Sequence, residues 1–269
     1  MQVLGVVGDD ALALCDRVAP HLDGRVAVVG HSNDTGDSLP TSNSALSQRP
    51  DGVDTAYALD SSGWTAAGED RSLEDVLDDL AATYDHALLA GFPDATAPTI
   101  AVGEAGAANV ALEVGNAADA DIEAVIDVLV DAEPHVTLET LVERVKASPR
   151  AERAGAIATF TGRVRTKDGE ADPETLELTF EKYEGVADER MRTIEDELME
   201  RDGVQEVALF HRTGTLESGE DIVFVVVLAG HRGEAFETVS DGIDRLKDEV
   251  PIFKRETTVE EDFWVHDRQ

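Results

Sequence analysis

The chain has 269 residues, of which 57 are acidic and 22 are basic, and its formal net charge at pH 7 is −35. This charge disfavours direct binding to DNA or RNA, whose phosphates repel it, and the 42% hydrophobic content supports packed cores instead of a disordered acidic chain. Acidic residues spread along the whole sequence are typical of proteins from salt-loving organisms, where the Debye length shrinks to ~3 Å at 1 M salt. An acidic mimic of nucleic acid is the less favoured alternative.

Cysteine usage and the lack of long apolar runs predict a soluble, cytoplasmic protein. The single cysteine, Cys15, excludes an internal disulfide and a cysteine-based metal cluster. The N-terminal segment has neither the basic nor the long apolar stretch of a signal peptide. No apolar run approaches the ~20 residues of a membrane span. We expect neither a metal nor a cofactor.

The length permits two domains, and the charge balance changes at about Glu133–Pro134. Residues 1–133 contain 4 of the 22 basic residues and 25 of the 57 acidic ones, so the basic residues are concentrated in the second half. We therefore expect an α/β protein with one domain at 1–133 and another at 134–269.

The first domain opens with an apolar run at 3–7, a turn at Gly8, a helical pattern over 12–19 and a second apolar run at 26–29. This order of strand, glycine turn, helix and strand predicts a doubly wound α/β domain. In such a domain, the turn at Gly8 is where a phosphate would be cradled.

The P-loop pattern GxxxxGK[ST] is not present after this turn. Counted from Gly8, the positions for glycine, lysine and a hydroxyl residue hold Ala13, Leu14 and Cys15. The two aspartates that follow Gly8 would also repel a triphosphate. Cys15 is best interpreted as a buried helix residue.

The remaining elements of this domain follow from hydrophobic periodicity and turn residues. Residues 35–63 are rich in Ser, Asp, Gly and Pro, which predicts a long loop or an eroded insertion. Ser72 is a predicted N-cap. The other predicted elements are a helix from 72, strands at 84–92, 99–102 and 108–114, and a helix at 122–130.

This half resembles the MobB family, the P-loop adaptor of molybdopterin-guanine dinucleotide synthesis. The matching segments are Val-Leu-Gly-Val-Val-Gly at 3–8, Arg-Val-Ala-Val-Val-Gly-His at 25–31, and 84–92 followed by Pro-Thr-Ile at 98–100. The family's GKT is absent, Gly30 replaces its lysine before the histidine, and Ala90 replaces its acidic residue before Gly-Phe. The resemblance implies a degenerate P-loop-like architecture, and no nucleotide-binding residue is carried over.

The second domain alternates helical and strand patterns. The predicted elements are helices at 135–145, 191–198 and 236–246, and strands at 155–165, 176–183, 204–212, 221–229, 252–256 and 263–265. Alternation through the first strand would place Arg163 and Arg165 on one face, opposite Phe160. Two guanidinium groups on one face form an anion cradle, although solvent-facing arginines are the simpler interpretation for this strand alone. His211 is predicted to be a structural turn residue.

Basic residues gather near the C-terminus of the chain. They are His231, Arg232, Arg245, Lys247, Lys254 and Arg255. The sequence has only five lysines against seventeen arginines, and two of the five lie seven residues apart here. A primary amine can exchange a proton during a reaction, whereas guanidinium cannot. A lone lysine would be a helix-end cation worth ~0.3–1 kcal/mol, but this pair beside His-Arg favours catalysis.

The second half resembles the catalytic large subunit of molybdopterin synthase, the MoaE family. The matching motifs, in the family's order from about Thr137 to the end, are GAIATFTGRVR at 155–165, HRTGTL at 211–216 with Gly-Glu at 219–220, Gly-His-Arg at 230–232 with Ala-Phe at 235–236, Leu-Lys at 246–247, and PIFKRE at 251–256 with Trp264. The resemblance implies an α+β domain with the α/β hammerhead fold. It also implies a homodimer with one small subunit at each end.

The resemblance further implies the reaction. Sulfur would pass from the C-terminal Gly-Gly thiocarboxylate of a small ubiquitin-like subunit to cyclic pyranopterin monophosphate, and two transfers would make the dithiolene of molybdopterin. Because the only cysteine has a helix-core context in the other domain, the sulfur must arrive on this partner.

By resemblance, Lys247 and Lys254 are the catalytic amines. One would act as acid or base on the developing carbonyl or enol oxygens and the other would stabilise an acyl oxyanion; the sequence leaves open which lysine does which. Arg163, Arg165, His231 and Arg232 would hold the phosphate and pterin, and Phe160, Arg255, Glu256 and Arg268 would line or support the site.

Two other functions remain open on the sequence. A non-catalytic adaptor could carry molybdopterin between enzymes, which the lost P-loop allows but the intact motifs of the second half disfavour. A nucleotide-dependent enzyme could use the first half, which Ala13, Leu14 and Cys15 disfavour.

Overall fold

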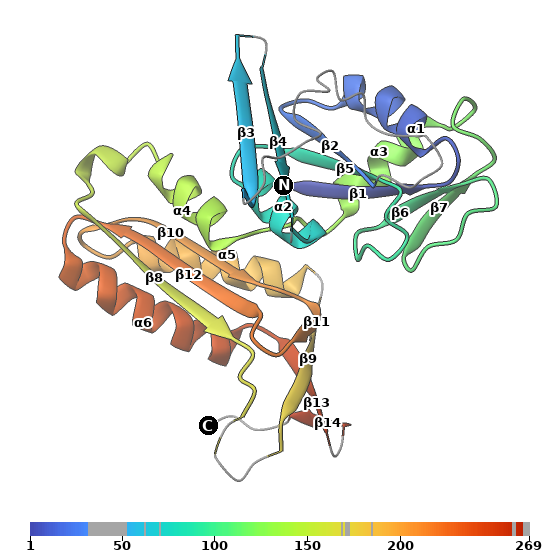
Figure 1. Ribbon diagram of the computed structural model, residues 1–269. Helices are drawn as coiled ribbons and strands as arrows, with labels where there is room; N and C mark the ends of the chain where they lie inside the picture. The colour runs from blue at the N-terminus through green and yellow to red at the C-terminus, as the bar shows by residue number, and fades with distance from the viewer. Residues whose placement is uncertain are drawn as a thin grey trace. The chain divides into compact units, whose positions relative to one another are not determined.

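The computed structural model describes residues 1–31, 53–61, 63–69, 71–167, 169, 173–183, 185–259 and 262–265 (Figure 1). The chain divides into two compact units, Met1–Thr137 and Leu138–Gln269. The division lies close to Glu133–Pro134, where the charge balance of the sequence changes. None of the helices in these ranges combines the length and apolar character that a membrane span requires.

The first unit is built on a parallel five-stranded sheet with the order β2-β5-β1-β6-β7. Its strands are β1 (Gln2–Val7), β2 (Val26–Gly30), β5 (His86–Ala90), β6 (Thr99–Val102) and β7 (Val110–Val114). The central strands β1, β5 and β6 are almost wholly buried, as expected when helices cover both faces of a parallel sheet.

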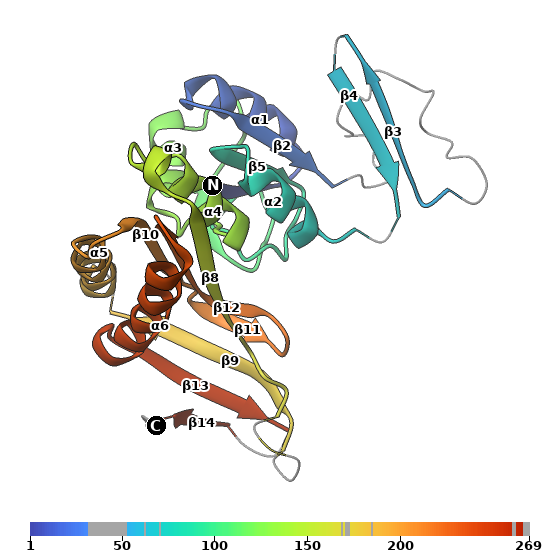
Figure 2. The ribbon, with the colours of Figure 1, turned by 90° about the vertical axis from the view of Figure 1, so that its left-hand side faces the viewer.

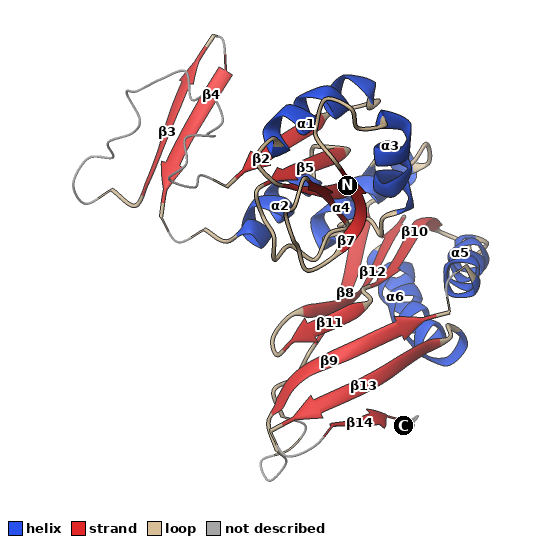
Figure 3. Cartoon of the chain, turned by 90° about the vertical axis from the view of Figure 1, so that its right-hand side faces the viewer, coloured by secondary structure: helices blue, strands red, loops and turns tan. Residues whose placement is uncertain are grey.

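Helices lie on both faces of this sheet (Figure 3). They are α1 (Ala11–Val18), the 3-10 helix η1 (Ala19–His21), α2 (Leu73–Ala81) and α3 (Ile122–Asp131). Leu4 and Val6 of β1 share a core with residues of α1 and α3, whereas Val3 shares another core with Leu73 and Leu77 of α2. The predicted doubly wound α/β fold is therefore confirmed.

Helix α2 begins where the sequence predicts. The Ser72 hydroxyl accepts the Asp75 N–H at 3.1 Å, and the Ser72 N–H donates to Asp75 Oδ2 at 2.8 Å. This reciprocal pair is a capping box, which satisfies two backbone donors that the first helical turn leaves open.

A hairpin between β2 and α2 was not predicted. Strands β3 (Thr55–Asp60) and β4 (Gly63–Gly68) pair antiparallel in a sheet of their own (Figure 2). The loop expected at 35–63 is therefore wrong at 55–60 and at 63, while its part up to residue 52 lies outside the described residues. The alternative of an eroded insertion stays a prediction. The sequence analysis interpreted the turn residues of this segment as a loop and did not recognise the short strands that flank them.

The second unit contains two antiparallel sheets, with the orders β10-β12-β8 and β11-β9-β13-β14. The three-stranded sheet consists of β8 (Ala156–Arg163), β10 (Val204–His211) and β12 (Asp221–Ala229). The four-stranded sheet consists of β9 (Thr175–Lys182), β11 (Gly214–Glu217), β13 (Ile252–Thr258) and β14 (Asp262–Val265). The sequence did not predict β11, because Leu216 is the one apolar residue among its four and alone is buried, so no apolar alternation is visible.

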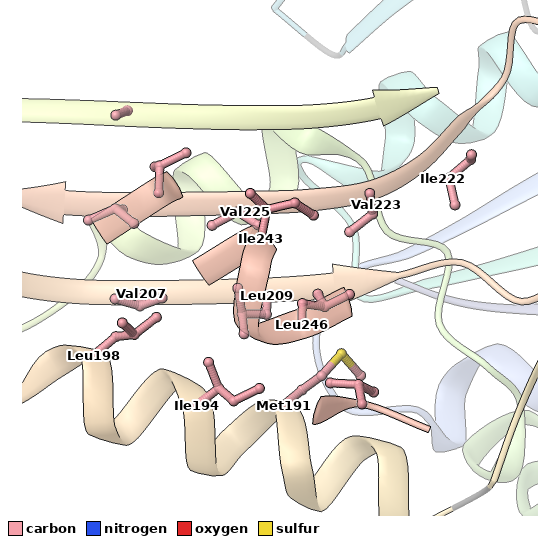
Figure 4. Packing of buried hydrophobic residues seen from close by; sticks show 14 of the residues in the cluster. Met191, Ile194, Leu198, Val207, Leu209, Ile222, Val223, Val225, Ile243 and Leu246 are labelled. Carbon is pink, nitrogen blue, oxygen red and sulfur yellow. The ribbon is translucent and has the colours of Figure 1, made fainter. Parts of the chain in front are cut away.

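The helices of this unit are α4 (Leu138–Lys146), the 3-10 helix η2 (Ala151–Arg153), α5 (Val186–Met199) and α6 (Arg232–Glu249). Figure 4 shows the core between the three-stranded sheet, α5 and α6: Ile194 and Leu198 of α5 face Val207 and Leu209 of β10. Antiparallel sheets with helices in separate chain segments make this unit an α+β fold, as the resemblance implied.

Candidate active site

Lys247 lies on the last turn of α6. The helix buries Ile243 and Leu246 in the core, and Lys247 directly after them is exposed. Its Nζ lies 6.0 Å from the centroid of the Phe160 ring on β8, at the outer limit of a cation–π contact. The structure therefore brings together two predicted site residues from distant segments of the sequence.

Gly162, two residues further along β8, lies between the half-buried Phe160 ring and Val223 of β12. A Cβ on Gly162 would lie 3.4 Å from the Phe160 ring and 2.5 Å from Val223 Cγ1 on β12. Because the second distance is too short for real carbon atoms, a larger residue would displace Val223 or shift β8 against β12. This packing is the physical reason for the glycine in the Thr-Gly-Arg sequence.

Ion pairs anchor the end of α6 that carries Lys247. Arg245 Nε donates to Glu249 Oε1 at 2.7 Å, and Arg245 Nη2 donates to Glu197 of α5. Arg190 of α5 also donates to Glu249. These hydrogen bonds, that of Arg245 first, hold the pKa of Glu249 below its ordinary value. The connection to α5 limits the positions that Lys247 can take.

Lys254 lies on β13, which begins directly after the short turn that ends α6. The β9–β13 register pairs Lys254 with Phe180 and Glu256 with Leu178. Phe180 and Leu178 are buried, so Lys254 and Glu256 share the sheet face that adjoins the core. Lys254 Nζ is 3.8 Å from Glu256 Oε2, which places a negative charge beside this amine.

His211 packs against Phe180, the β9 residue that is paired with Lys254. It is buried at the end of β10, its ring meets the Phe180 ring edge to face at 4.9 Å between centroids, and its Nδ1 is 2.7 Å from the Arg212 carbonyl oxygen. These contacts fit a structural role for His211, but the residue ends strand β10 and does not lie in the predicted turn.

Arg255 lies on the opposite face of β13 from Lys254. Its register partners are Thr179 on β9 and Trp264 on β14, and its Cζ is 6.0 Å from the centroid of the Trp264 ring. Successive residues of a strand point to opposite faces. Within one copy of the chain, Arg255 therefore packs against Trp264 on one face of β13, and Lys254 lies on the other face.

The two arginines predicted to share a strand face do not share one, because β8 ends at Arg163 and Arg165 follows in a loop. Arg163 Nη2 donates to the Gly219 carbonyl oxygen, and Arg163 Nε lies 3.1 Å from Asp221 Oδ1. Both arginines are exposed. The predicted cradle is therefore not a strand face, and Arg163 already has acceptors within its own unit.

His231 and Arg232 begin α6, with His231 as its N-cap residue, and both are exposed. From Arg232 to Lys247 the helix advances ~22 Å at 1.5 Å per residue, which is too far for one small substrate to touch both. The structure therefore does not bring His231 and Arg232 to Lys247 within one chain. Arg268 lies outside the described residues.

Sequence reasoning missed one contact of this region. The Thr175 hydroxyl donates to Glu256 Oε1 at 2.6 Å. Thr175 opens an alternating strand, and its placement depends on an irregular register between β9 and β13. No pattern in the sequence marks that irregularity.

The first unit has a cavity of about 360 Å³ at the end of β1, where a nucleotide would bind in a fold of this kind. Among the described residues, its lining is Gly8, Asp9, Asp10, Val102, Gly103, Glu104, Ala105, Gly115 and Asn116, none of them basic. Gly8 has a φ of 117°, and a Cβ there would lie 2.2 Å from the Val102 carbonyl oxygen. The turn thus requires its glycine, while the acidic lining repels anions.

Cys15 is fully buried in α1, and burial raises the pKa of its thiol to about 12. The thiolate is the nucleophilic form of cysteine, so Cys15 supplies no sulfur nucleophile at neutral pH. Within the described ranges, no group of three or more His, Cys, Asp or Glu side chains is placed to hold a metal ion.

Fold and site define the class of the protein. It is a two-unit α/β chain whose second, α+β unit presents two lysine amines, one from α6 and one from β13. The one cysteine of the chain, Cys15, is buried in the first unit. Such a site suits proton transfer and the stabilisation of negative charge.

Known proteins with similar sequences give the family. The family model described as MoaE protein matches residues 132–249. A relative from Haloferax volcanii, named probable molybdopterin synthase, is 58% identical over 269 residues and covers 100% of both chains. The molybdopterin synthase catalytic subunit of Pyrococcus abyssi is 36% identical over 124 residues, or 46% of this chain and 82% of that protein. A crystal structure of molybdopterin synthase from Staphylococcus aureus aligns with 50% of this chain and 93% of its own at 29% identity, with a TM-score of 0.44.

The chain therefore belongs to the MoaE family, and it is an enzyme of the molybdopterin synthase class. The family resemblance drawn from the motifs of the second half is confirmed. The Haloferax relative matches along both units, and its source agrees with the salt-loving origin expected from the charge.

Proposed function

We propose that the second unit transfers sulfur from the C-terminal Gly-Gly thiocarboxylate of a small ubiquitin-like subunit to cyclic pyranopterin monophosphate, making the dithiolene of molybdopterin. The observation that carries this proposal is the placement of Lys247 and Lys254 on adjoining elements. Lys247 is held by the anchored end of α6 near Phe160, and Lys254 lies beside Glu256. Family membership supplies the reaction, and the two amines supply its proton transfer and charge stabilisation.

The atoms of the transfer show what the amines must do. The thiocarboxylate sulfur bonds to a substrate carbon, and the bond from sulfur to the acyl carbon breaks when water adds there, so that the carrier leaves as a carboxylate. This addition passes through a tetrahedral oxyanion, which an ammonium group stabilises. The substrate oxygen that sulfur displaces needs a proton, which an amine can deliver. We assign these two tasks jointly to Lys247 and Lys254.

The sulfur arrives on the partner in this proposal. Cys15 is buried, with the pKa of its thiol raised to about 12, so it forms no persulfide or thiolate donor at neutral pH.

The substrate anion is bound across a homodimer in this proposal. His231 and Arg232 of one copy meet Lys247 and Lys254 of the other, because Arg232 and Lys247 of one chain are ~22 Å apart along α6. A two-fold axis would repeat this arrangement at both sites. Arg163 and Arg165 would contact the phosphate or pterin from the same copy as the lysines.

Mixed dimers test the composite site. Lys247→Ala and His231→Ala homodimers should both be inactive, whereas random mixing should restore about one quarter of the wild-type rate, because half of the dimers regain one intact site. Mixtures that stay inactive would show that both residues act within one chain.

The reaction itself is tested with purified protein in high salt, cyclic pyranopterin monophosphate and thiocarboxylated small subunit. Wild type and residues 134–269 alone should form molybdopterin, and Lys254→Ala should not. Lack of turnover by the wild type at every salt concentration would refute the synthase function and leave the non-catalytic carrier as the function to pursue.

The first unit is accessory in this proposal. It retains a P-loop-like, MobB-like architecture at 1–133, but the cavity at Gly8 has an acidic lining. We place the enzyme in the cytoplasm, which fractionation of the source cells with an antibody to the chain would test.

A further inference from the structure

Strand β9 carries a β-bulge beside the strand that holds Lys254. The regular register of the β9–β13 pair ends with a shift that pairs Thr258 with Thr175 and passes over Leu176. The bulge reverses the alternation: Leu178 is 7% exposed, whereas Leu176, two residues away, is 50% exposed. Thr175 takes the inward position and is 6% exposed. Bulges re-aim side chains in this way and are frequent next to active sites.

The re-aimed side chain meets the carboxylate that lies beside the Lys254 amine. The Thr175 hydroxyl donates to Glu256 Oε1 at 2.6 Å. The other oxygen, Glu256 Oε2, lies 3.8 Å from Lys254 Nζ. The Glu256 side chain is 15% exposed and that of Lys254 is 35% exposed, so water surrounds neither group fully. One carboxylate therefore connects a buried hydroxyl to a proposed catalytic amine.

Hydrogen bonds hold the bulge on both sides. The Thr175 N–H donates to the Thr166 carbonyl oxygen at 2.8 Å, and the Ser218 N–H donates to the Leu176 carbonyl oxygen at 3.0 Å. The hydroxyl oxygens of Thr166 and Ser218 are 2.7 Å apart. Because Thr166 directly follows Arg165, the bulge joins the segment that carries Arg165 to the strand that carries Lys254.

We propose that Thr175 is a positioning residue for Lys254: its hydroxyl fixes the Glu256 carboxylate, whose second oxygen then holds the Lys254 amine in place. This inference rests on the proposed catalytic role of Lys254. A lysine has a long, flexible stem, so an amine oriented by one carboxylate oxygen is only as fixed as that carboxylate. The terminal torsion of glutamate is broad, and the Thr175 hydroxyl removes that freedom.

A purely structural role for Thr175 would affect the stability of the fold and not the position of the Lys254 amine. It would only satisfy a buried hydroxyl and a half-buried carboxylate, and its loss would lower the stability of the fold without changing the working position of the amine. The two roles separate once Glu256 is altered, because a positioning residue that acts through Glu256 has nothing further to contribute.

The test is a double-mutant cycle on the full chain in high salt, with kcat and KM for cyclic pyranopterin monophosphate measured at saturating thiocarboxylated small subunit. The variants are Thr175→Val, Glu256→Gln and the two combined, with Thr175→Ser as the rescue. Thr238→Val, which alters a threonine buried in α6, is the matched control. Thermal unfolding of each variant gives the folded fraction at the assay temperature.

We expect Thr175→Val to lower kcat about tenfold with KM changed less than about twofold, because only the positioning of the amine is lost. Thr175→Ser should keep the wild-type kcat within about twofold, and the combined variant should be no slower than Glu256→Gln alone. Thr238→Val should retain the wild-type kcat.

Several results would overturn the proposal. Additive losses in the combined variant, an equal loss in Thr175→Ser, or a fall in kcat that follows the folded fraction would each assign Thr175 a structural role. A wild-type kcat in Thr175→Val, together with an inactive Lys254→Ala, would reject the positioning role and leave the proposed function intact. Full activity of Lys254→Ala would instead reject the proposed function.

Discussion

The first unit ends its central strand β1 at Val7, and Gly8 then leads towards the N-terminus of α1. The second unit ends α6 at Glu249, two residues after Lys247 and shortly before β13. Backbone N–H groups at a helix N-terminus favour anions, yet the cavity at Gly8 is lined by acidic and neutral residues. The C-terminal end of α6, where carbonyl groups favour cations, carries the amine. The backbone of each unit thus offers a site, and the side chains decide which chemistry it can perform.

The basic residues of the two units make the same contrast. In the first unit, Arg17 donates to the Ala117 and Ala120 carbonyl oxygens, Arg25 lies 4.6 Å over the Tyr84 ring, and Arg71 pairs with Asp79. These three arginines all serve the local structure. In the second unit, Lys247 and Lys254 are oriented by neighbours but remain accessible, Lys254 with 35% of its side chain exposed.

The largest effect is expected from removing an amine. Lys247→Ala should lower kcat by a factor of about 10²–10⁴, the usual contribution of a positioned acid–base or charge-stabilising group. The measurement is molybdopterin formation at saturating carrier. Lys146→Ala is the matched control, because Lys146 also lies on the last turn of a helix, α4, and is half exposed beside Glu143.

The control separates catalysis from a simple helix-end charge. Both lysines interact with the carbonyl end of a helix by ~0.3–1 kcal/mol, so both variants should lose similar stability. Equal activity of Lys247→Ala and Lys146→Ala would remove the functional contrast between these two lysines.

A smaller effect is expected when a closely packed glycine of each unit is replaced by alanine. Gly162→Ala brings a Cβ within 2.5 Å of Val223 Cγ1, and Gly5→Ala brings one within 2.3 Å of Thr99 Oγ1. Each should lower the free energy of unfolding by ~1–3 kcal/mol, measured by denaturant unfolding in high salt. Only Gly162→Ala should also lower kcat per folded molecule, because only Gly162 lies against Phe160; an equal fall for Gly5→Ala would contradict the division of roles.

A still smaller effect concerns pH. Glu195 of α5 is 7% exposed, and burial raises the pKa of its carboxyl, opposed by the hydrogen bond from the Leu209 N–H at 2.7 Å. The folded state therefore binds this proton more tightly than the unfolded chain, and the contribution of Glu195 to stability falls as pH rises from the ordinary glutamate value through the raised one.

Glu195→Gln tests this sign. The amide oxygen can still accept the Leu209 N–H, but it does not titrate. The difference in unfolding free energy between the variant and the wild type should therefore shift in favour of the variant from about pH 4 to pH 7. Denaturant unfolding at constant high salt gives this difference at each pH, and a difference that does not change with pH would mean that Glu195 is ionised equally in both states.

Periodicity predicted most of the strands and helices because burial imposes it. The apolar runs of β1 and β6, the alternation of β8 and the 3–4 spacing of α6 follow from the faces they bury. The β3–β4 hairpin escaped because it buries little: Leu59 is 78% and Trp64 64% exposed. Without a buried face, turn residues dominate the pattern.

The site was less predictable than the fold, for geometric reasons. Arg232 and Lys247 belong to one basic stretch, but the helical rise separates them by ~22 Å. Arg165 was assigned to the face of Arg163 because the end of β8 has no sequence signal. Thr175 reaches Glu256 through a register shift, which depends on the pairing of two strands and not on either strand alone.

The smallest effect is expected from the only cysteine. Cys15→Ala should leave sulfur transfer unchanged, because the thiol is fully buried in the first unit and its pKa is raised to about 12. Stability should fall slightly, since the change removes one buried atom from the core of α1. The native wild type should also resist alkylation by iodoacetamide, whereas unfolded protein should react. Loss of molybdopterin formation in Cys15→Ala at full folded fraction would mean that the first unit takes part in sulfur chemistry, and the contrast between an accessory and a catalytic unit would no longer hold.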